Sequence, residues 1–378
     1  MTDTFDVIVV GVGGMGASAC YHLARRGKRV LGLEQFGIPH SMGSSHGVNR
    51  IIRLAYYEDP SYVPLLRRAF ELWRQLESGF GEQLLIVTGS IDAGDEDHFV
   101  FRESKRSCDL HNIPHEVLDA SNLMARYPAF KVPDSYKAVF QPDGGFIMSE
   151  RAIVANVTGA IEAGAEIRGY EPMLSWTTTS PGVHVETAKG SYAAEQVIFT
   201  SGAWIGQHLS ELQGVSVPER QVLGWFQPAT PALFSPEALP VFNLANGEER
   251  YYGFPIYGIP GFKFGKYHHL GEDVDPDHWE RLPNQQDEDA LRAAVQRFFP
   301  DADGPVLTLA SCMFTNTPDE HFIIDRLEPG SPVIVASPCS GHGYKFASVI
   351  GEILADLAIN DRTDHNIDLF KLNRFAVA

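Results

Sequence analysis

A glycine-rich segment near the amino terminus constrains the fold of this chain more than any other feature. Residues Phe5 to Val10 form a short apolar run, typical of a strand buried on both faces, and GVGGMG follows directly at 11–16. A helical stretch then runs from Ala17 to Arg26. The apolar run Arg29 to Leu33 predicts a second buried strand, which closes in Glu34. This order of elements predicts one βαβ unit of a nucleotide-binding domain.

The residues of this unit have distinct expected roles in binding a dinucleotide. Gly11 permits a tight turn, Gly13 lets a pyrophosphate approach the backbone, and Gly16 lets the helix pack closely on the strand. Gly14 belongs to the same expected cofactor site. Glu34, 23 positions after Gly11, would accept hydrogen bonds from ribose hydroxyls and repel a 2′-phosphate. We therefore expect an adenine dinucleotide; a glycine-rich turn without a ligand is the alternative.

The charge balance excludes some partners and poses a question about one segment. The chain has 48 acidic and 30 basic side chains, a formal net charge of −18, which argues against nucleic acid and against an anionic membrane surface. An acidic metabolite would need a local basic site. The segment GSSHGVNRIIR at 43–53 carries two arginines and a histidine, and either faces something negative or is a solvated loop.

Cysteine usage and the amino terminus predict a cytoplasmic protein with free thiols. The four cysteines are scattered without metal-ligand spacing, so no metal site is expected. No secretory leader is evident. The run from Val7 to Ala24 is free of formal charge for 18 residues, but its four glycines favour a strand, turn and helix over a membrane span.

The remaining pattern predicts an α/β fold of two domains. A helix is expected from Tyr62 to Leu76, whereas residues 80–149 and about 218–310 have the pattern of short strands, loops and proline-rich connections. The buried strand VIVAS at 333–337 leads through PCSGHGYK into a helix from Phe346 to Ile359. We predict a discontinuous, Rossmann-like FAD-binding domain and an inserted substrate domain with a mixed or antiparallel sheet. The FAD-binding domain comprises residues 1–80, 150–217 and 311–378; the substrate domain comprises 81–149 and 218–310.

The interrupted nucleotide domain favours FAD over NAD. NAD dehydrogenases usually continue as an unbroken nucleotide domain, whereas this chain supplies a further strand, glycine-rich turn and helix near its end, SGHGYKF. A helix that begins there would direct its backbone N–H groups at a negatively charged flavin edge. Gly341 and Gly343 are therefore included among the expected cofactor-binding residues.

Four motifs together resemble a known enzyme family. GSSHGVNRIIR, YYGFP followed by KFGK, SCMFTNTPDEHFIID and SGHGYKF, in this order, resemble monomeric sarcosine oxidase and N-methyltryptophan oxidase, from Asp6 to about Leu372. The resemblance implies an FAD enzyme that oxidises a small secondary amino acid at a C–N bond. It implies that dioxygen takes the electrons, that hydrogen peroxide is released, and that the chain is a monomer.

The resemblance also implies how the cofactor is held. Cys312 matches the cysteine that carries FAD through a thioether; a small buried hydrophobe is the alternative for a lone cysteine. His46 and Arg50 match residues that lie against the flavin ring, where positive charge stabilises the anionic reduced flavin. Ser44 belongs to the same motif and is an expected cofactor-binding residue.

Two basic residues match those that bind the substrate carboxylate in the family. Arg53 and Lys345 are these residues by resemblance, and Lys345 also lies in the expected cofactor site. The alternative is that Arg50 and Arg53 pair with surface carboxylates such as Glu58 or Asp59.

Aromatic residues and a further cation complete the expected site. Tyr252 matches an active-site aromatic, although tyrosine in a strand is more often packing. Lys263 matches the lysine that activates oxygen, and Lys266 competes by proximity. His268 is favoured over His269 as the pocket histidine.

Departures from the family pattern leave the substrate open. Phe314 replaces a tyrosine near the substrate, VNR replaces the usual DTR, and KYHHLGED differs in length and register. An N-methyl or cyclic secondary amino acid is expected, and sarcosine itself is not assured. The alternatives are a dehydrogenase that passes electrons to a carrier, an NAD-linked dehydrogenase and a non-catalytic module that only binds FAD or NAD.

Overall fold

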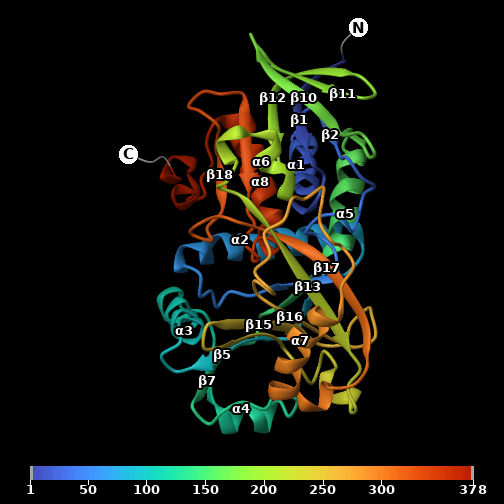
Figure 1. Cartoon of the computed structure of the whole chain (residues 1–378). Helices are drawn as coiled ribbons and strands as arrows, with labels where there is room; N and C mark the ends of the chain where they lie inside the picture. Colours follow the sequence, from blue (N-terminus) through green and yellow to red (C-terminus); the bar gives the residue numbers. More distant parts are fainter. Residues whose placement is uncertain (1–2, 376–378) are drawn as a thin grey trace.

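Two eight-stranded sheets, one above the other in Figure 1, form the framework of the chain. The computed structural model describes residues 3–375. The helix α2, Val63–Phe80, lies between the two sheets in Figure 1. A small three-stranded sheet connects the two halves.

The first sheet contains the predicted nucleotide-binding unit. Its central strand β1, Asp3–Val10, lies between β2, Val30–Leu33, and β12, Ser191–Phe199, and is parallel to both. The strand β19, Val333–Ser337, is parallel to β12 on its other side. The other strands are β9 (Glu166–Arg168), β10 (Met173–Thr179), β11 (Gly182–Thr187) and β18 (Ile323–Arg326). Because β9 is also parallel to β2, five parallel strands run in one direction, and their carboxyl ends lie at one edge of the sheet.

The helices of this half pack through glycine. The first helix α1, Gly14–Arg25, contacts both α5, Ser149–Glu162, and α8, Ala347–Asn360. A Cβ on Gly351 of α8 would lie 2.2 Å from Oγ of Ser18, so only glycine allows this approach. A short helix, α6, spans Ile205–His208.

The second sheet is built mostly from the segments predicted to form the substrate domain. Its order is β17-β13-β16-β15-β14-β5-β7-β6, and all neighbours are antiparallel except β5 and β14. Its strands are β5 (Ser90–Asp95), β6 (Glu116–Asp119), β7 (Tyr136–Gln141), β13 (Val217–Phe226), β14 (Val241–Asn246), β15 (Glu249–Phe254), β16 (Phe262–Lys266) and β17 (Val306–Asn316). The strand β17 crosses residue 311, where a domain boundary was placed; the boundaries themselves stay a prediction.

Three helices in this half were not predicted. Residues 80–149 and 218–310 were expected to contain only strands and loops, which is wrong for α3, Phe99–His111, α4, Ala120–Arg126, and α7, Gln285–Phe298. The last of these begins with a reciprocal capping box, in which the side chains of Asn284 and Asp287 each accept a hydrogen bond from the other's backbone N–H.

The three-stranded sheet connects the two halves near the basic segment. The strands β3, Asn49–Ile52, β8, Gly145–Met148, and β4, Leu85–Val87, pair in the order β3-β8-β4. The segment GSSHGVNRIIR therefore ends in a strand instead of remaining a loop throughout.

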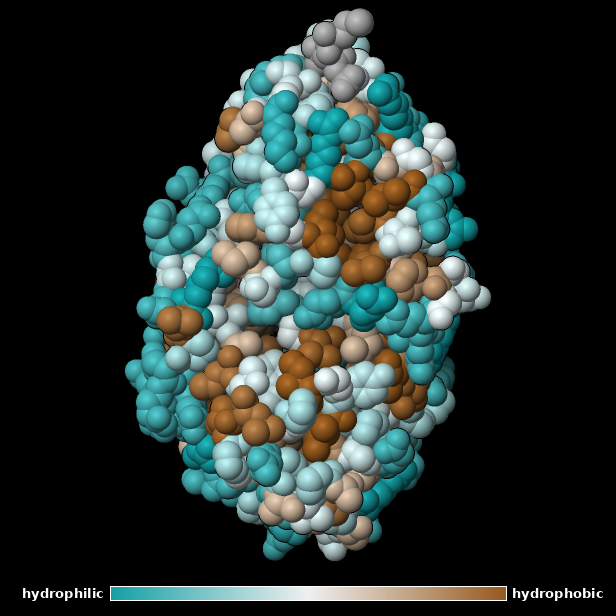
Figure 2. Space-filling model, turned by 90° about the vertical axis from the view of Figure 1, so that its right-hand side faces the viewer, coloured by the Kyte–Doolittle hydropathy of each residue, from teal (hydrophilic) through white to brown (hydrophobic). Residues whose placement is uncertain are grey.

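The surface is mixed in polarity. Figure 2 shows hydrophobic side chains gathered in the upper and in the lower half of one face, with a more polar band between them. Within residues 3–375, none of the helices has the length and apolar character required to cross a bilayer.

Candidate active site

A single elongated cavity lies where the carboxyl ends of the parallel strands meet the second sheet. The residues directly after β1, β2, β12 and β19 all line it, namely Gly11, Glu34, Thr200 and Pro338. Its empty volume is about 1640 Å³, open mouth included. Its lining includes both the residues of the glycine-rich turn and Lys345, so one cavity reaches the expected dinucleotide site and the expected carboxylate site.

The glycine-rich turn forms one end of the cavity and fits a dinucleotide. Gly11 has φ of +90°, a left-handed conformation that glycine adopts readily. A Cβ on Gly16 would lie 1.8 Å from the carbonyl oxygen of Gly11, so this position requires glycine for packing, and Gly16 does not itself line the cavity. Gly13 caps α1 without a side-chain hydrogen bond, and both Gly13 and Gly14 line the cavity. The turn thus presents open backbone and a helix amino terminus to an anion.

Glu34 lies beside the glycine-rich turn, and backbone N–H groups hold its carboxylate in place. Its Oε2 accepts a hydrogen bond from the N–H of Val12 at 2.9 Å, and its Oε1 accepts one from the N–H of Phe36 at 3.0 Å. The carboxylate is 4% exposed and lines the cavity. Glu34 thus lies beside the glycine-rich turn, and its role as the acceptor for ribose hydroxyls stays a prediction.

The middle of the cavity carries two cations from different sheets. Arg50 of β3 donates from Nη2 to the carbonyl oxygen of Ser44 at 2.7 Å. Lys263 of β16 donates from Nζ to the carbonyl oxygens of Gly47 and Asn49 and to Oδ1 of Asn49, at 2.8, 2.9 and 2.8 Å. Burial and the neighbouring Arg50 lower the pKa of Lys263 well below its usual value.

His46 lies near these cations but does not line the cavity. It is buried, and among the described residues its Nε2 has no hydrogen-bond partner. Burial and the charge of Arg50 lower its pKa to about 4, so the ring is neutral at pH 7.

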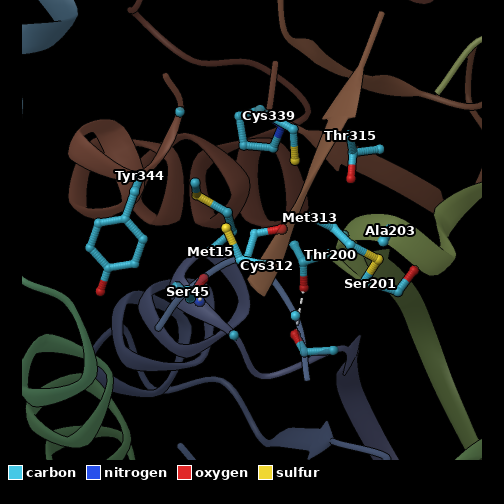
Figure 3. Close-up of a pocket in the computed structure, with 18 of the residues that line it drawn as sticks. Met15, Ser45, Thr200, Ser201, Ala203, Cys312, Met313, Thr315, Cys339 and Tyr344 are labelled. Carbon is cyan, nitrogen blue, oxygen red and sulfur yellow. Dashed lines mark hydrogen bonds between the residues drawn. The ribbon is translucent and has the colours of Figure 1, made fainter. Parts of the chain in front are cut away.

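Cys312 lies on the side of the second sheet that faces the cavity. It pairs across β13 and β17 with Gln221 and shares this face with Leu223. Figure 3 shows Cys312, Met15 and Cys339 around the same space. Burial raises the pKa of the Cys312 thiol, and Arg50 and Lys263 act in the opposite direction. A thiol beside two cations fits the chemistry of attachment to a cofactor.

The segment after β19 forms the opposite wall. Gly341 has φ of +77°, and a Cβ there would lie 2.6 Å from the ring of Phe314. A Cβ on Gly343 would overlap the carbonyl oxygen of Pro338. Both glycines line the cavity, as does Ser44 on the basic segment.

Lys345 follows this segment and belongs to the same cavity lining. It is 5% exposed, lines the cavity, and donates from Nζ to the carbonyl oxygen of His342 at 2.7 Å. Burial lowers its pKa to about 7, and the charge of Arg53 acts in the same direction.

Three neighbouring aromatic rings also line the cavity. The ring of Tyr267 lies 5.1 Å from that of Tyr252 and 5.9 Å from that of Phe314, centroid to centroid, and all three residues line the cavity. Of these, Tyr252 and Phe314 were predicted and Tyr267 was not.

Arg53 lies near Lys345, but its side chain is turned into the protein. It is fully buried and does not line the cavity. Its Nη2 donates to both oxygens of Glu58, at 3.0 and 2.9 Å, and its Nη1 donates to the carbonyl oxygen of Ala55. The alternative pairing with Glu58 therefore occurs, although the pair is buried. Asp59 instead caps the short helix Pro60–Tyr62.

The two candidate histidines also lie outside the described lining of the cavity. Nδ1 of His268 lies 2.8 Å from Glu219, and its Nε2 lies 3.2 Å from Glu320, and these two hydrogen bonds raise its pKa to about 9. His269 is buried and bonds Asp287 at 2.9 Å. Lys266, which was the competitor of Lys263, pairs with Glu249 at 2.7 Å and does not line the cavity.

Sequence reasoning missed residues that support the basic segment. Glu150 accepts hydrogen bonds from the N–H groups of Gly47 and Val48 at 2.7 and 3.1 Å. Val48 has φ of +76°, a strained conformation for a β-branched residue.

A residue that supports the glycine-rich turn was also missed. Thr200 donates from Oγ1 to the carbonyl oxygen of Gly11 at 2.7 Å. Its position directly after a buried parallel strand was the one available signal.

The chain is similar to known flavoproteins over its whole length. The model of one family, described as FAD dependent oxidoreductase, matches residues 6–357. Monomeric sarcosine oxidase from Streptomyces avermitilis is 40% identical over 384 residues, which covers 100% of both chains. N-methyl-L-tryptophan oxidase from Yersinia pestis is 35% identical and covers 98% of this chain and 99% of its own.

Solved structures agree with this assignment. NikD, an unusual amino acid oxidase essential for nikkomycin biosynthesis, has a TM-score of 0.83 and 25% identity, with 98% of both chains covered. L-proline dehydrogenase from P. horikoshii has a TM-score of 0.85 at 21% identity, with 100% of this chain and 99% of its own covered, and shows the same fold.

Proposed function

Because this chain belongs to the FAD-dependent oxidoreductase family, in the group of monomeric sarcosine oxidase and N-methyltryptophan oxidase, we propose that it oxidises an N-methyl or cyclic secondary amino acid. The product is an imine, which hydrolyses in water. One observation carries the proposal: a single cavity is lined both by the glycine-rich dinucleotide turn and by the buried amine of Lys345.

FAD, when bound, supplies the acceptor for the two electrons that leave the substrate. We propose that Gly11, Gly13, Gly14 and Glu34 hold its adenine half, and that Ser44, Gly341 and Gly343 adjoin the ring. Cys312 attaches the cofactor through a thioether, which is supported by its position in the cavity beside Arg50 and Lys263. The residues present fit the cofactor, because the open backbone of the turn leaves room for a pyrophosphate.

Lys345 and Arg53 bind the substrate carboxylate in this proposal. Lys345 already faces the cavity, and Arg53 lies behind it, so Arg53 must exchange a protein partner for the substrate. Holding the acid group fixes the amine and its substituents, and such positioning lowers the barrier by several kcal/mol. Tyr252 and Phe314 contact the substituents.

The remaining cations act on charge and protonation. Arg50 keeps the site electropositive, which lowers the pKa of a bound ammonium and so favours the neutral, reactive amine, while His46 adjoins the flavin as a neutral ring. We propose that Lys263 promotes reduction of dioxygen to hydrogen peroxide, since a fixed cation in a buried site stabilises developing negative charge. His268 remains a proposed catalytic residue. A cytoplasmic monomer is proposed as the working form.

A peroxide screen tests the function. The purified protein is mixed with N-methyl and cyclic secondary amino acids and, as matched controls, with the primary amino acids that lack the N-alkyl group. We expect peroxide with at least one secondary amino acid and far less with its primary counterpart. Amino acid consumption without peroxide, but with reduction of an artificial electron carrier, would favour the dehydrogenase alternative.

A further inference from the structure

Asp92 is a buried carboxylate on the face of the second sheet that borders the cavity. It lies on β5 opposite Asn243 of β14, and Asn243 lies opposite Tyr252 of β15. Cross-strand neighbours point to the same face of a sheet, so Asp92 shares the face of the cavity residue Tyr252. Asp92 is 1% exposed.

Two donors fix the direction of this carboxylate. Its Oδ1 accepts a hydrogen bond from Nδ2 of Asn243 at 2.7 Å, and its Oδ2 accepts one from Oγ of Ser104 on α3 at 2.8 Å. Because both oxygens accept, the contacts suit the ionised form. Burial raises the pKa of Asp92, whereas Arg53 and these two hydrogen bonds lower it.

The fixed carboxylate is directed at Arg53. Its Oδ1 lies 3.6 Å from Nε of Arg53, the one guanidinium nitrogen without a hydrogen bond among the described residues. The other two nitrogens are bonded to Glu58 and to the carbonyl oxygen of Ala55. Two internal carboxylates thus share one cation.

Aromatic rings add to the hold on the guanidinium. Its carbon lies 4.6 Å from the ring centroid of Tyr56 and 4.3 Å from that of Tyr57. The charge of Arg53 is therefore already paired without a ligand, and an incoming carboxylate has to compete with anions that are in place.

We propose that Asp92 is a positioning residue that acts through Arg53: it competes with the substrate carboxylate for the guanidinium, and so sets KM for the acid. The inference rests on the proposed function, in which Arg53 takes part in binding the carboxylate. Asp92 touches neither the amine nor the bond that is oxidised. Its influence therefore falls on KM and on the affinity for simple acids, while kcat changes little.

The test compares Asp92→Asn with the unchanged chain as full-length, flavin-loaded protein. Acetate is the probe, because it offers a carboxylate and no amine, and its Kd is measured by calorimetry. We expect the Kd for acetate to fall by about tenfold, the low end of the usual range for coupled sites. We expect KM for a secondary amino acid to fall with it. The conservative variant Asp92→Glu, which restores the charge, should move both constants back towards those of the unchanged chain.

A control variant separates this effect from the loss of an ion pair outside the cavity. Glu352 pairs with Arg68 at 2.7 Å between α8 and α2, and neither residue lines the cavity. Glu352→Gln removes the same unit of charge and should leave the Kd for acetate unchanged. A purely structural role for Asp92 would lower stability in both variants and tighten acetate binding in neither.

Unchanged or weaker acetate binding by Asp92→Asn would overturn the inference. If that variant does not fold, Asp92→Ser removes the charge with a smaller polar side chain, and acetate should again bind more tightly; an unaltered Kd overturns the inference in this case too. Failure of the proposed function is a separate result, in which the unchanged chain oxidises no secondary amino acid while the acetate comparison still reports on Asp92 and Arg53.

Discussion

The Nζ atom of Lys263 lies 2.8 Å from Oδ1 of Asn49, so a side chain of β16 in the second sheet is hydrogen-bonded to the basic segment. Two backbone carbonyl oxygens, those of Gly47 and Asn49, complete the contacts of the ammonium group. The lysine is 2% exposed and lines the cavity. All three partners are acceptors, which suits the protonated ammonium although burial lowers its pKa, and a cation held in this way needs no rearrangement to stabilise negative charge that develops beside it.

Replacing this lysine should slow the reaction with oxygen. Lys263→Met keeps the length and apolar stem of the side chain and removes the charge. Removal of one preorganised electrostatic contact typically costs about 100-fold to 1,000-fold in rate, and we expect a loss of that order in reoxidation of the substrate-reduced protein by oxygen. Stopped-flow absorbance after anaerobic reduction measures it. Lys266→Met is the control, since Lys266 pairs with Glu249 outside the cavity; equal rates in both variants would contradict the assignment.

Removing the thiol of Cys312 should release the cofactor from the chain. When the protein is precipitated with acid, yellow colour should stay with the pellet of the unchanged chain and pass to the supernatant for Cys312→Ala. Cys339→Ala provides the control, because Cys339 also lines the cavity and is not assigned to attachment. Colour in the supernatant of the unchanged chain would show that no covalent link forms.

Binding of a simple acid should depend on pH through Lys345. Its pKa is about 7, so the ammonium is charged below that pH and neutral above it. We therefore expect the Kd for acetate to rise as the pH is raised through about 7. His342 has a pKa of about 4 and the pKa of Arg53 lies far above its usual value, so neither changes charge between about pH 6 and 9.

The variant Lys345→Met identifies the source of this dependence. It should bind acetate weakly and with little change over the same pH range. A variant that retained the pH dependence of the unchanged chain would assign it to another group.

Loss of the Glu34 carboxylate should destabilise the nucleotide turn. Glu34→Gln leaves at most one oxygen to accept from the N–H groups of Val12 and Phe36, so one buried donor loses its partner. We expect the free energy of unfolding to fall by about 1–3 kcal/mol, as for other buried unsatisfied groups. Urea denaturation measures it. Glu166→Gln, on β9 where the side chain is 46% exposed, should be nearly neutral.

The first βαβ unit was predictable because its signals are local. The apolar runs, the glycines of the turn and the acid after the second strand all follow from one short stretch, and the strand Val333–Ser337 was placed at its observed bounds. The helix α7 was missed because its sequence is predominantly polar, which masks its apolar face. The capping pair Asn284 and Asp287, which begins the helix, was overlooked for the same reason.

Contacts between distant strands lie beyond such reasoning. The sequence suggested Glu58 as a partner of Arg53, since the two are five residues apart, and the structure contains this pair. Asp92 lies on β5 of the second sheet and Arg53 follows β3 of the three-stranded sheet, so only the packing of two sheets brings them together. No spacing rule predicts that pairing, because register and sheet order depend on the whole fold.

Anaerobic mixing of the purified protein with a secondary amino acid tests the central claim most directly. The claim is that one cavity holds both the cofactor and an amino acid whose carboxylate is bound at Lys345. We predict that an N-methyl or cyclic secondary amino acid bleaches the yellow absorbance of the protein, and that Lys345→Met needs a much higher concentration to do so. Absorbance that no secondary amino acid alters, but that a nicotinamide cofactor bleaches, would contradict the account.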